Sequence, residues 1–130
     1  MKLIKKSALA VIKEGKLLLV RKRGSPLLLM PGGKPEGRET DIDALHREIK
    51  EELGCGIEQD SIVFLGTFED IAAEKDARVS IDLFIGALKG VPKASSEIEE
   101  IAWADSSDSN ISPIIKNKIM PFLIEKRMLI

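Results

Sequence analysis

The chain has 130 residues, of which 44% are hydrophobic and 32% charged, and its net charge at pH 7 is −1. This length suits one domain with a hydrophobic core, so we expect a single domain over residues 1–130. The balanced charge argues against a nucleic-acid-binding protein, which is normally basic, and no apolar run approaches the ~20 residues that a membrane span needs.

The first thirty residues are patterned for strands. Residues 3–12 are rich in aliphatic and β-branched side chains, residues 13–16 are a turn signal, and residues 17–23 form a second apolar run. Together these segments predict a hairpin. Residues 27–30 predict a short strand that ends at a proline and two glycines, residues 31–33.

Residues 40–53 predict a helix. Thr40 is a good N-cap, and acidic residues follow in the first turn, where the helix dipole favours anions. Gly54 is a natural end for the helix. Apolar residues recur at helical spacing along one face, namely Ile42, Leu45, Ile49 and Leu53.

The second half of the chain adds strands and a second helix. Three segments predict strands: residues 62–68, 79–88 and 98–104. Ser112 followed by proline predicts an N-cap and the first turn of a helix over residues 113–127, which Pro121 should kink or split. Strands, a helix, more strands and a last helix predict an α+β fold, in which helices pack on a mixed β-sheet.

Glu48, Glu51 and Glu52 share one stripe of the first predicted helix, away from its apolar face. Like charges at this spacing repel, and the last turn lies at the negative end of the helix dipole. A divalent cation such as Mg²⁺ would compensate, because it binds carboxylate oxygens. The alternative is a solvated charged face, with Arg47 and Glu51 as an i,i+4 ion pair.

The loop before this helix favours the metal interpretation. Gly32 and Gly33 let the backbone approach a ligand closely, and they stand at a fixed distance from the glutamates. Residues 33–55 closely resemble the signature box of the Nudix hydrolase superfamily, including its MutT-like members. The fixed positions of that box are matched by Gly33, Glu39, Arg47, Glu48, Ile49, Glu51, Glu52 and Gly54. Two positions depart from it: Cys55 replaces an aliphatic residue, and Arg38 stands where many members have glycine.

The resemblance implies an α/β/α sandwich with a mixed β-sheet and hydrolysis of a nucleoside diphosphate linked to another moiety. It also implies a divalent cofactor, with Mg²⁺ expected and Mn²⁺ as the alternative. The implied metal ligands are Glu48, Glu51, Glu52, the carbonyl of Gly33 and a remote acidic residue. Glu97 is the candidate for that remote residue, and Glu100 is the alternative.

Other residues of the box take further roles by resemblance. Glu48 is the first candidate for the general base and Glu51 the second. Arg47 is expected to hold a catalytic carboxylate through a bidentate contact, so it belongs to the catalytic group. Glu39 and Gly54 are expected to be structural.

Basic residues near the box are candidates for substrate binding. Arg21 and Arg23 share one face of the predicted strand, with Lys22 on the other, and could hold phosphates. Ordinary exposed strand-end charges are the alternative. Gly32 and Lys34 complete the predicted substrate-binding group.

The attached group of the substrate stays open. The small size favours a nucleoside triphosphate pyrophosphohydrolase, with a nucleotide sugar such as ADP-ribose or a dinucleoside polyphosphate as alternatives. A non-catalytic ligand-binding regulator is disfavoured, because such a protein would be expected to lose glutamates of the box. We expect a small-molecule substrate, no nucleic-acid or membrane partner, and a monomer or homodimer.

The expected location is cytoplasmic. Cys55 is the only cysteine, so the fold does not depend on an oxidising compartment. The first residues lead straight into a strand-like pattern, without the apolar region and cleavage site of a signal peptide.

Overall fold

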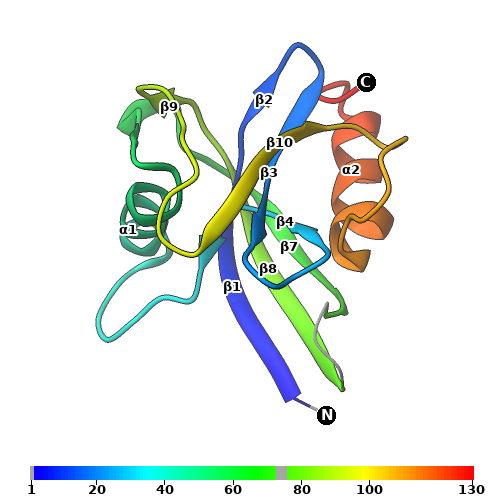
Figure 1. The fold of residues 1–130 in the computed structure, drawn as a ribbon, viewed down its shortest axis with the longest axis horizontal. Helices are drawn as coiled ribbons and strands as arrows, with labels where there is room; N and C mark the ends of the chain where they lie inside the picture. The colour runs from blue at the N-terminus through cyan, green and yellow to red at the C-terminus, as the bar shows by residue number, and fades with distance from the viewer. Residues whose placement is uncertain (1, 73–75) are drawn as a thin grey trace.

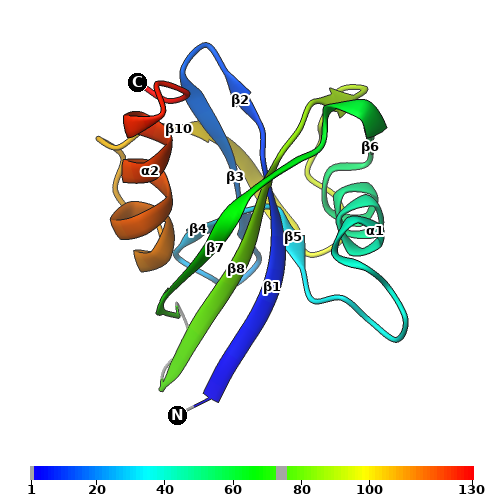
Figure 2. The same cartoon turned by 180° about the vertical axis from the view of Figure 1, so that it is seen from behind.

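A computed structural model of the chain describes residues 2–72 and 76–130. Two β-sheets lie between two helical layers (Figures 1 and 2). Helix α1 (Asp41–Leu53) covers one side, and the carboxyl-terminal helix, which ends with α2 (Met120–Glu125), covers the other. This arrangement confirms the predicted α/β/α sandwich with its mixed β-sheet.

The first sheet has four strands in the order β5-β1-β8-β7. Strand β1 (Lys2–Ala10) runs parallel to β8 (Ala77–Ile85), and β8 pairs antiparallel with β7 (Val63–Ile71). Strand β5 (Gly32–Gly33) pairs antiparallel with β1, with Ser7 opposite Gly33. The sheet is therefore mixed, and it fixes the two glycines against its first strand.

The second sheet joins β10 (Ile98–Ala104), β3 (Lys16–Lys22) and β2 (Ile12–Lys13), and β4 (Leu28–Leu29) pairs with β3. The predicted hairpin is correct only at its tip. Residues 3–12 are not one strand, because β1 ends at Ala10 and the chain crosses to the second sheet. The remaining short elements are β6 (Gly56–Ile57), its partner β9 (Leu88–Lys89) and a 3₁₀ turn at Gln59–Ser61.

Strand β3 explains how the sheets hold both helical layers. Its residues 17–20 are all apolar and at most 1% exposed. Because side chains alternate across a strand, Leu17 and Leu19 join the core cluster beneath the carboxyl-terminal helix. Leu18 and Val20 join the cluster that includes residues of α1. A continuous apolar run of this kind is typical of a strand buried on both faces.

The boundaries of α1 follow from its end residues, and the prediction of a helix over residues 40–53 is confirmed. The Thr40 hydroxyl accepts the Asp43 N–H at 3.1 Å, and the Asp43 carboxylate accepts the Thr40 N–H at 3.1 Å, which forms a capping box. Gly54 ends the helix with a φ of 65°, and its N–H donates to the Lys50 carbonyl. This left-handed conformation is the one that favours glycine.

The carboxyl-terminal helix is continuous over residues 113–125 rather than split at Pro121. Its segment Ile115–Ile119 is a π-helix, in which the Met120 N–H donates to the Ile115 carbonyl. Pro121 follows directly, in the first turn of α2. The helix therefore continues through Pro121, and the π-helical hydrogen-bond pattern directly before it accommodates a residue without an N–H.

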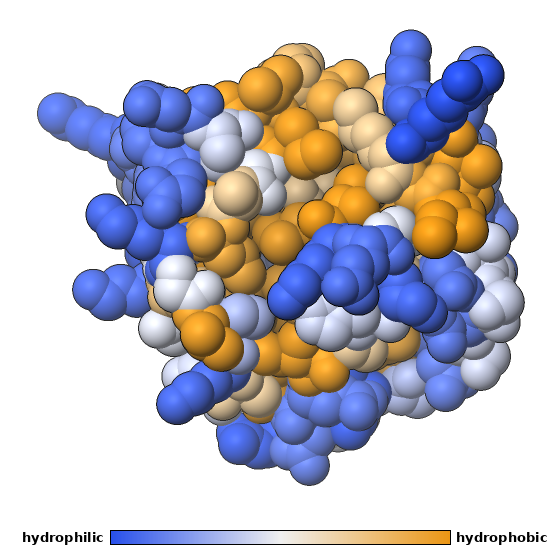
Figure 3. Space-filling model, turned by 90° about the horizontal axis from the view of Figure 1, so that it is seen from above, coloured by the Kyte–Doolittle hydropathy of each residue, from blue (hydrophilic) through white to orange (hydrophobic). Residues whose placement is uncertain are grey.

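Some large apolar side chains remain on the surface. Val63 and Phe64, adjacent on β7, are both 54% exposed, and Ile130 is also exposed. Figure 3 shows apolar surface among charged side chains on the face seen from above. Within residues 2–72 and 76–130, no helix is long and apolar enough to cross a membrane.

Candidate active site

The two glycines of β5 bring the backbone against α1. The Gly32 N–H donates to Glu52 Oε1 at 2.9 Å. A Cβ atom at Gly33 would lie 2.7 Å from the carboxyl carbon of Glu48, and one at Gly32 would lie 2.1 Å from the Ser7 carbonyl oxygen. Gly32 also has a φ of 139°. A side chain is therefore excluded at Gly32, whereas one at Gly33 would displace the carboxyl group of Glu48. The glycines thus let α1 and β1 approach each other.

Glu52 is the most buried of the three clustered glutamates, with 2% of its surface exposed. Burial raises its pKa to about 7, against the opposing effect of the Gly32 hydrogen bond. The negative charges of Glu48 and Glu97 contribute to this raised pKa, and the positive charge of Lys22 opposes it. Glu52 is thus a carboxylate whose charge the surrounding protein only partly neutralises.

Arg47 organises the next part of the site. Its Nε donates to Glu39 Oε2 at 2.7 Å and its Nη2 donates to Glu39 Oε1 at 2.9 Å, so the bidentate contact is with Glu39. Its Nη1 donates to Glu48, and its Nη2 also donates to the Lys34 carbonyl at 3.1 Å. The Arg47 hydrogen bond holds the pKa of Glu39 below its usual range. Glu39 thus anchors the arginine that contacts Glu48.

Glu48 and Glu51 have different surroundings. Glu48 is half-buried, and burial raises its pKa although Arg47 opposes the shift. The side chain of Glu51 is 53% exposed and lies 3.6 Å from Arg47 Nη1. The i,i+4 ion pair expected for a simple charged face is therefore present, but it accounts for Glu51 and not for the half-buried Glu48 or the buried Glu52.

A cavity of about 300 Å³ opens beside these residues, and we call it the glutamate cavity. Glu48 and Glu97 line it together with Gly33, Lys34 and Lys22. Lys22 Nζ lies 3.4 Å from Glu97 Oε1. The cavity therefore combines carboxylates with lysine side chains, which suits a phosphate substrate bound together with a cation.

Arg21 and Arg23 both pair with glutamates of β10. Arg21 donates to Glu100 Oε1 at 2.8 Å, and Arg23 pairs with Glu99 at 3.2 Å. These contacts hold both arginines on the other face of β3, while Lys22 lines the glutamate cavity. Arg21 and Arg23 are not among the residues that line this cavity, so their role in substrate binding stays a prediction. The same register leaves Glu100 paired with Arg21 and puts Glu97 at the cavity.

In the part of the chain that the structure describes, no three acidic, histidine or cysteine side chains are already grouped to hold a metal ion. Each of the candidate ligands has another partner: Glu48 contacts Arg47, Glu52 accepts from Gly32, and Glu97 pairs with Lys22. The donor set nevertheless fits a hard cation, because Glu48 and Glu52 are carboxylates with raised pKa values. A cation bound by Glu48 and Glu97 would replace Arg47 and Lys22 as their partners.

A model of the NUDIX domain family matches residues 4–120. The chain belongs to the Nudix family. It is accordingly a hydrolase that acts on a pyrophosphate linkage. Members of this family generally use divalent metals and act on nucleotide-derived small molecules. A comparison with curated proteins finds no significant match.

Solved structures share the Nudix fold along nearly the whole chain. The MutT Nudix hydrolase from Burkholderia pseudomallei is 22% identical with a TM-score of 0.72, and the match covers 96% of this chain and 98% of that one. The E. coli ORF135 protein is 22% identical with a TM-score of 0.73, covering 97% and 92%. An ADP-ribose pyrophosphatase from Streptococcus suis is 18% identical with a TM-score of 0.63, covering 95% and 91%. At these identities the likeness concerns the fold.

Proposed function

We propose that this Nudix hydrolase uses Mg²⁺ to hydrolyse a nucleoside diphosphate linked to another moiety, and that its substrate is a nucleoside triphosphate. The observation that carries the proposal is the pairing of Glu48 and Glu52, two carboxylates with raised pKa values, beside a cavity that Lys22 also lines. Such carboxylates favour a cation, and lysines favour phosphate.

The proposed metal ligands are Glu48, Glu51, Glu52, the Gly33 carbonyl and Glu97. Three come from one helical stripe, Gly33 lies against Glu48, and Glu97 lines the same cavity. A bound Mg²⁺ would neutralise charge on the diphosphate and orient it. Mn²⁺ has the same preference for oxygen ligands and is the alternative.

Glu48 is proposed as the general base that accepts the proton of the attacking water. It is half-buried beside the cavity and its pKa is raised, whereas Glu51, the second candidate, is largely exposed. A carboxylate with a raised pKa is a better proton acceptor near neutral pH. Arg47 acts as a positioning residue for Glu48, and its bidentate contact with Glu39 keeps it in place.

Lys22, Lys34 and the Gly32 backbone are proposed to hold the substrate. Both lysines and Gly32 line the glutamate cavity, so phosphate oxygens bound there would meet positive charge. A nucleotide sugar such as ADP-ribose remains the second candidate, since one structural neighbour is an ADP-ribose pyrophosphatase. We further propose a single domain in the cytoplasm, without nucleic-acid partners, as a monomer or homodimer.

A substrate panel tests this function. The purified protein is incubated with Mg²⁺ and each of the four nucleoside triphosphates, ADP-ribose and a dinucleoside polyphosphate, and released pyrophosphate or phosphate is measured. We expect the fastest turnover with a triphosphate and none in excess EDTA. The Glu52→Gln variant is the matched control for contaminating hydrolase. Faster turnover of ADP-ribose would replace the substrate proposal, and metal-independent turnover would contradict the mechanism.

A further inference from the structure

Glu97, the proposed remote metal ligand, lies in a tight turn directly before β10. The turn is closed by the Ile98 N–H, which donates to the Ser95 carbonyl at 3.0 Å. Within it, Ser96 has a φ of 55°, in the left-handed region that residues other than glycine rarely adopt. Such a conformation persists only where surrounding contacts hold it, and residues of this kind cluster at functional sites. The contacts that hold this turn therefore also decide where the Glu97 carboxylate lies.

Arg23, the residue directly after β3, supplies contacts on both sides of Glu97. Its backbone N–H donates to the Glu97 carbonyl at 2.9 Å. Its side-chain Nη1 donates to the Ser96 carbonyl at 2.8 Å, and its Nε lies 3.2 Å from Glu99 Oε2. One guanidinium group therefore links Ser96, which precedes Glu97, to Glu99, which follows it in β10.

An irregularity in β10 accompanies these contacts. Ile98 lies opposite Lys22, and Glu100 lies opposite Arg21, so Glu99 is an extra residue in the pairing of β10 with β3. Bulges of this kind bend a strand and redirect side chains, and they are common next to active sites. Here the extra residue is the one whose carboxylate pairs with the guanidinium group.

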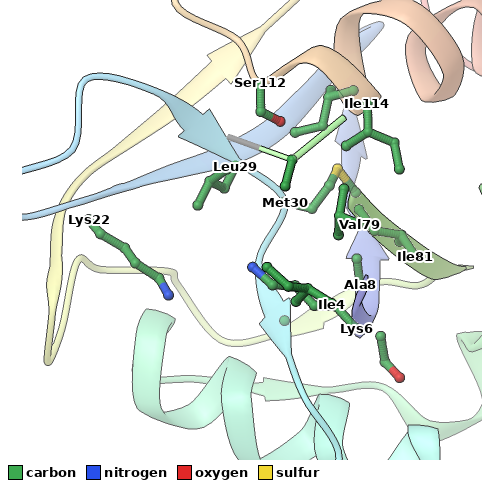
Figure 4. Close-up of a pocket in the computed structure, with 14 residues that line it drawn as sticks. Ile4, Lys6, Ala8, Lys22, Leu29, Met30, Val79, Ile81, Ser112 and Ile114 are labelled. Carbon is green, nitrogen blue, oxygen red and sulfur yellow. The ribbon is translucent and has the colours of Figure 1, made fainter. Parts of the chain in front are cut away.

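The same turn is attached to α1. The Ser95 N–H donates to the Glu52 carbonyl at 3.0 Å, so the turn that carries Glu97 is hydrogen-bonded to the helix of the clustered glutamates. Glu97 and Glu48 line the glutamate cavity together, and the negative charge of Glu97 helps to raise the pKa of Glu52. Figure 4 shows the side chain of Lys22, which pairs with Glu97, extending from β3 toward α1. The turn therefore decides how far the Glu97 carboxylate lies from the glutamates of α1.

We propose that Arg23 is a positioning residue for Glu97: it holds the turn so that the Glu97 carboxylate faces the cation that the α1 glutamates bind. The inference rests on the proposed function, in which Glu97 is a metal ligand. Arg23 acts through the Ser96 carbonyl and Glu99, and it touches neither the metal nor the substrate. A phosphate contact, the role that the sequence suggests, would act on the substrate instead. Loss of Arg23 therefore changes metal affinity in the first role and KM for the substrate in the second.

Binding of Mn²⁺ to the substrate-free protein, measured by electron paramagnetic resonance, tests this role without turnover. Residues that hold a metal ligand typically contribute ~10–100-fold to metal affinity, and the Arg23 side chain is 66% exposed, so we expect Arg23→Ala to weaken binding about tenfold. Arg23→Lys should recover part of the loss, because an ammonium group can donate to the Ser96 carbonyl but lacks the planar geometry that contacts both partners. Lys16→Ala is the matched control, since Lys16 lies at the other end of β3 and pairs with Asp105. For Arg23→Ala, KM for a nucleoside triphosphate at saturating Mg²⁺ should match that of the wild type.

A double variant that combines Arg23→Ala with Glu97→Gln gives the sharpest comparison. If the arginine acts through Glu97, the double variant should bind Mn²⁺ as weakly as Glu97→Gln alone, because the effects of coupled residues are not additive. Additive losses would show that Arg23 acts independently of Glu97, and an unchanged Mn²⁺ affinity with a raised KM would show a phosphate contact; either result overturns the inference and leaves the proposed function standing. If Glu97→Gln binds Mn²⁺ like the wild type, the proposed ligand and the role of Arg23 both fail. A wild-type protein that binds no Mn²⁺ would contradict the proposed function itself.

Discussion

Glu52→Gln should stabilise the metal-free protein, and the gain should depend on pH. The glutamine side chain can still accept the Gly32 N–H, but it carries no buried charge. The pKa of Glu52 rises from its ordinary value of 4.5 to about 7 on folding. At ~1.4 kcal/mol per pKa unit, ionised Glu52 therefore costs about 3 kcal/mol of folding free energy. If Glu52 lay on an exposed helix face, its repulsion with the neighbouring glutamates would cost only a few tenths of a kcal/mol.

The direction of the pH dependence follows from the raised pKa. The folded protein binds the Glu52 proton more tightly than the unfolded chain, so protonation favours folding below pH 4.5. That advantage is lost as the pH rises from 4.5 to about 7. The gap between variant and wild type should therefore be small at pH 4.5 and reach about 3 kcal/mol at pH 8, or ~10 °C in melting temperature.

Thermal and urea unfolding in EDTA, followed by circular dichroism from pH 4.5 to 8, measures this gap. Glu51→Gln is the matched control, because its side chain is 53% exposed and should show little pH-dependent gain. Adding Mg²⁺ should narrow the gap, since a bound cation stabilises the folded state of the wild type. A gap that does not change with pH, or a variant less stable than wild type at pH 8, would refute the reasoning.

Three further predictions concern catalysis. Chelation by EDTA should abolish hydrolysis and added Mg²⁺ should restore it; full activity in EDTA would exclude the metal mechanism. Glu48→Gln should lower kcat by at least ~10²-fold at saturating Mg²⁺, as expected for a general base, whereas Glu97→Gln should raise the Mg²⁺ concentration for half-maximal activity. Recovery of Glu48→Gln by added metal would move the base to Glu51. Lys22→Ala should lower kcat/KM about tenfold or more while Arg21→Ala changes it little, because Lys22 lines the glutamate cavity and Arg21 pairs with Glu100 instead. Equal losses in the two variants would contradict this assignment.

Local signals in the sequence were sufficient for the helix of the site and for its chemistry. Helix α1 was predictable because its apolar spacing, Thr40 cap and Gly54 end are all local signals, and the structure has them as expected. The glutamates of the box and the preceding glycines carry the family resemblance, which the family match confirms. These features depend on residues close together in the chain, where spacing and geometry are directly related.

Which side chains face the site depends on how distant segments pack together. Periodicity separated Lys22 from Arg21 and Arg23, but only the pairing of β3 with β10, which places Arg21 opposite Glu100, shows that Lys22 faces the cavity. Likewise, the sequence predicted an ordinary helix cap at Ser112, whose burial beside β4 and β8 is a tertiary feature. Glu52 is buried because β5 packs its glycines against α1. Burial and strand pairing join residues far apart in the chain, so no local pattern contains them.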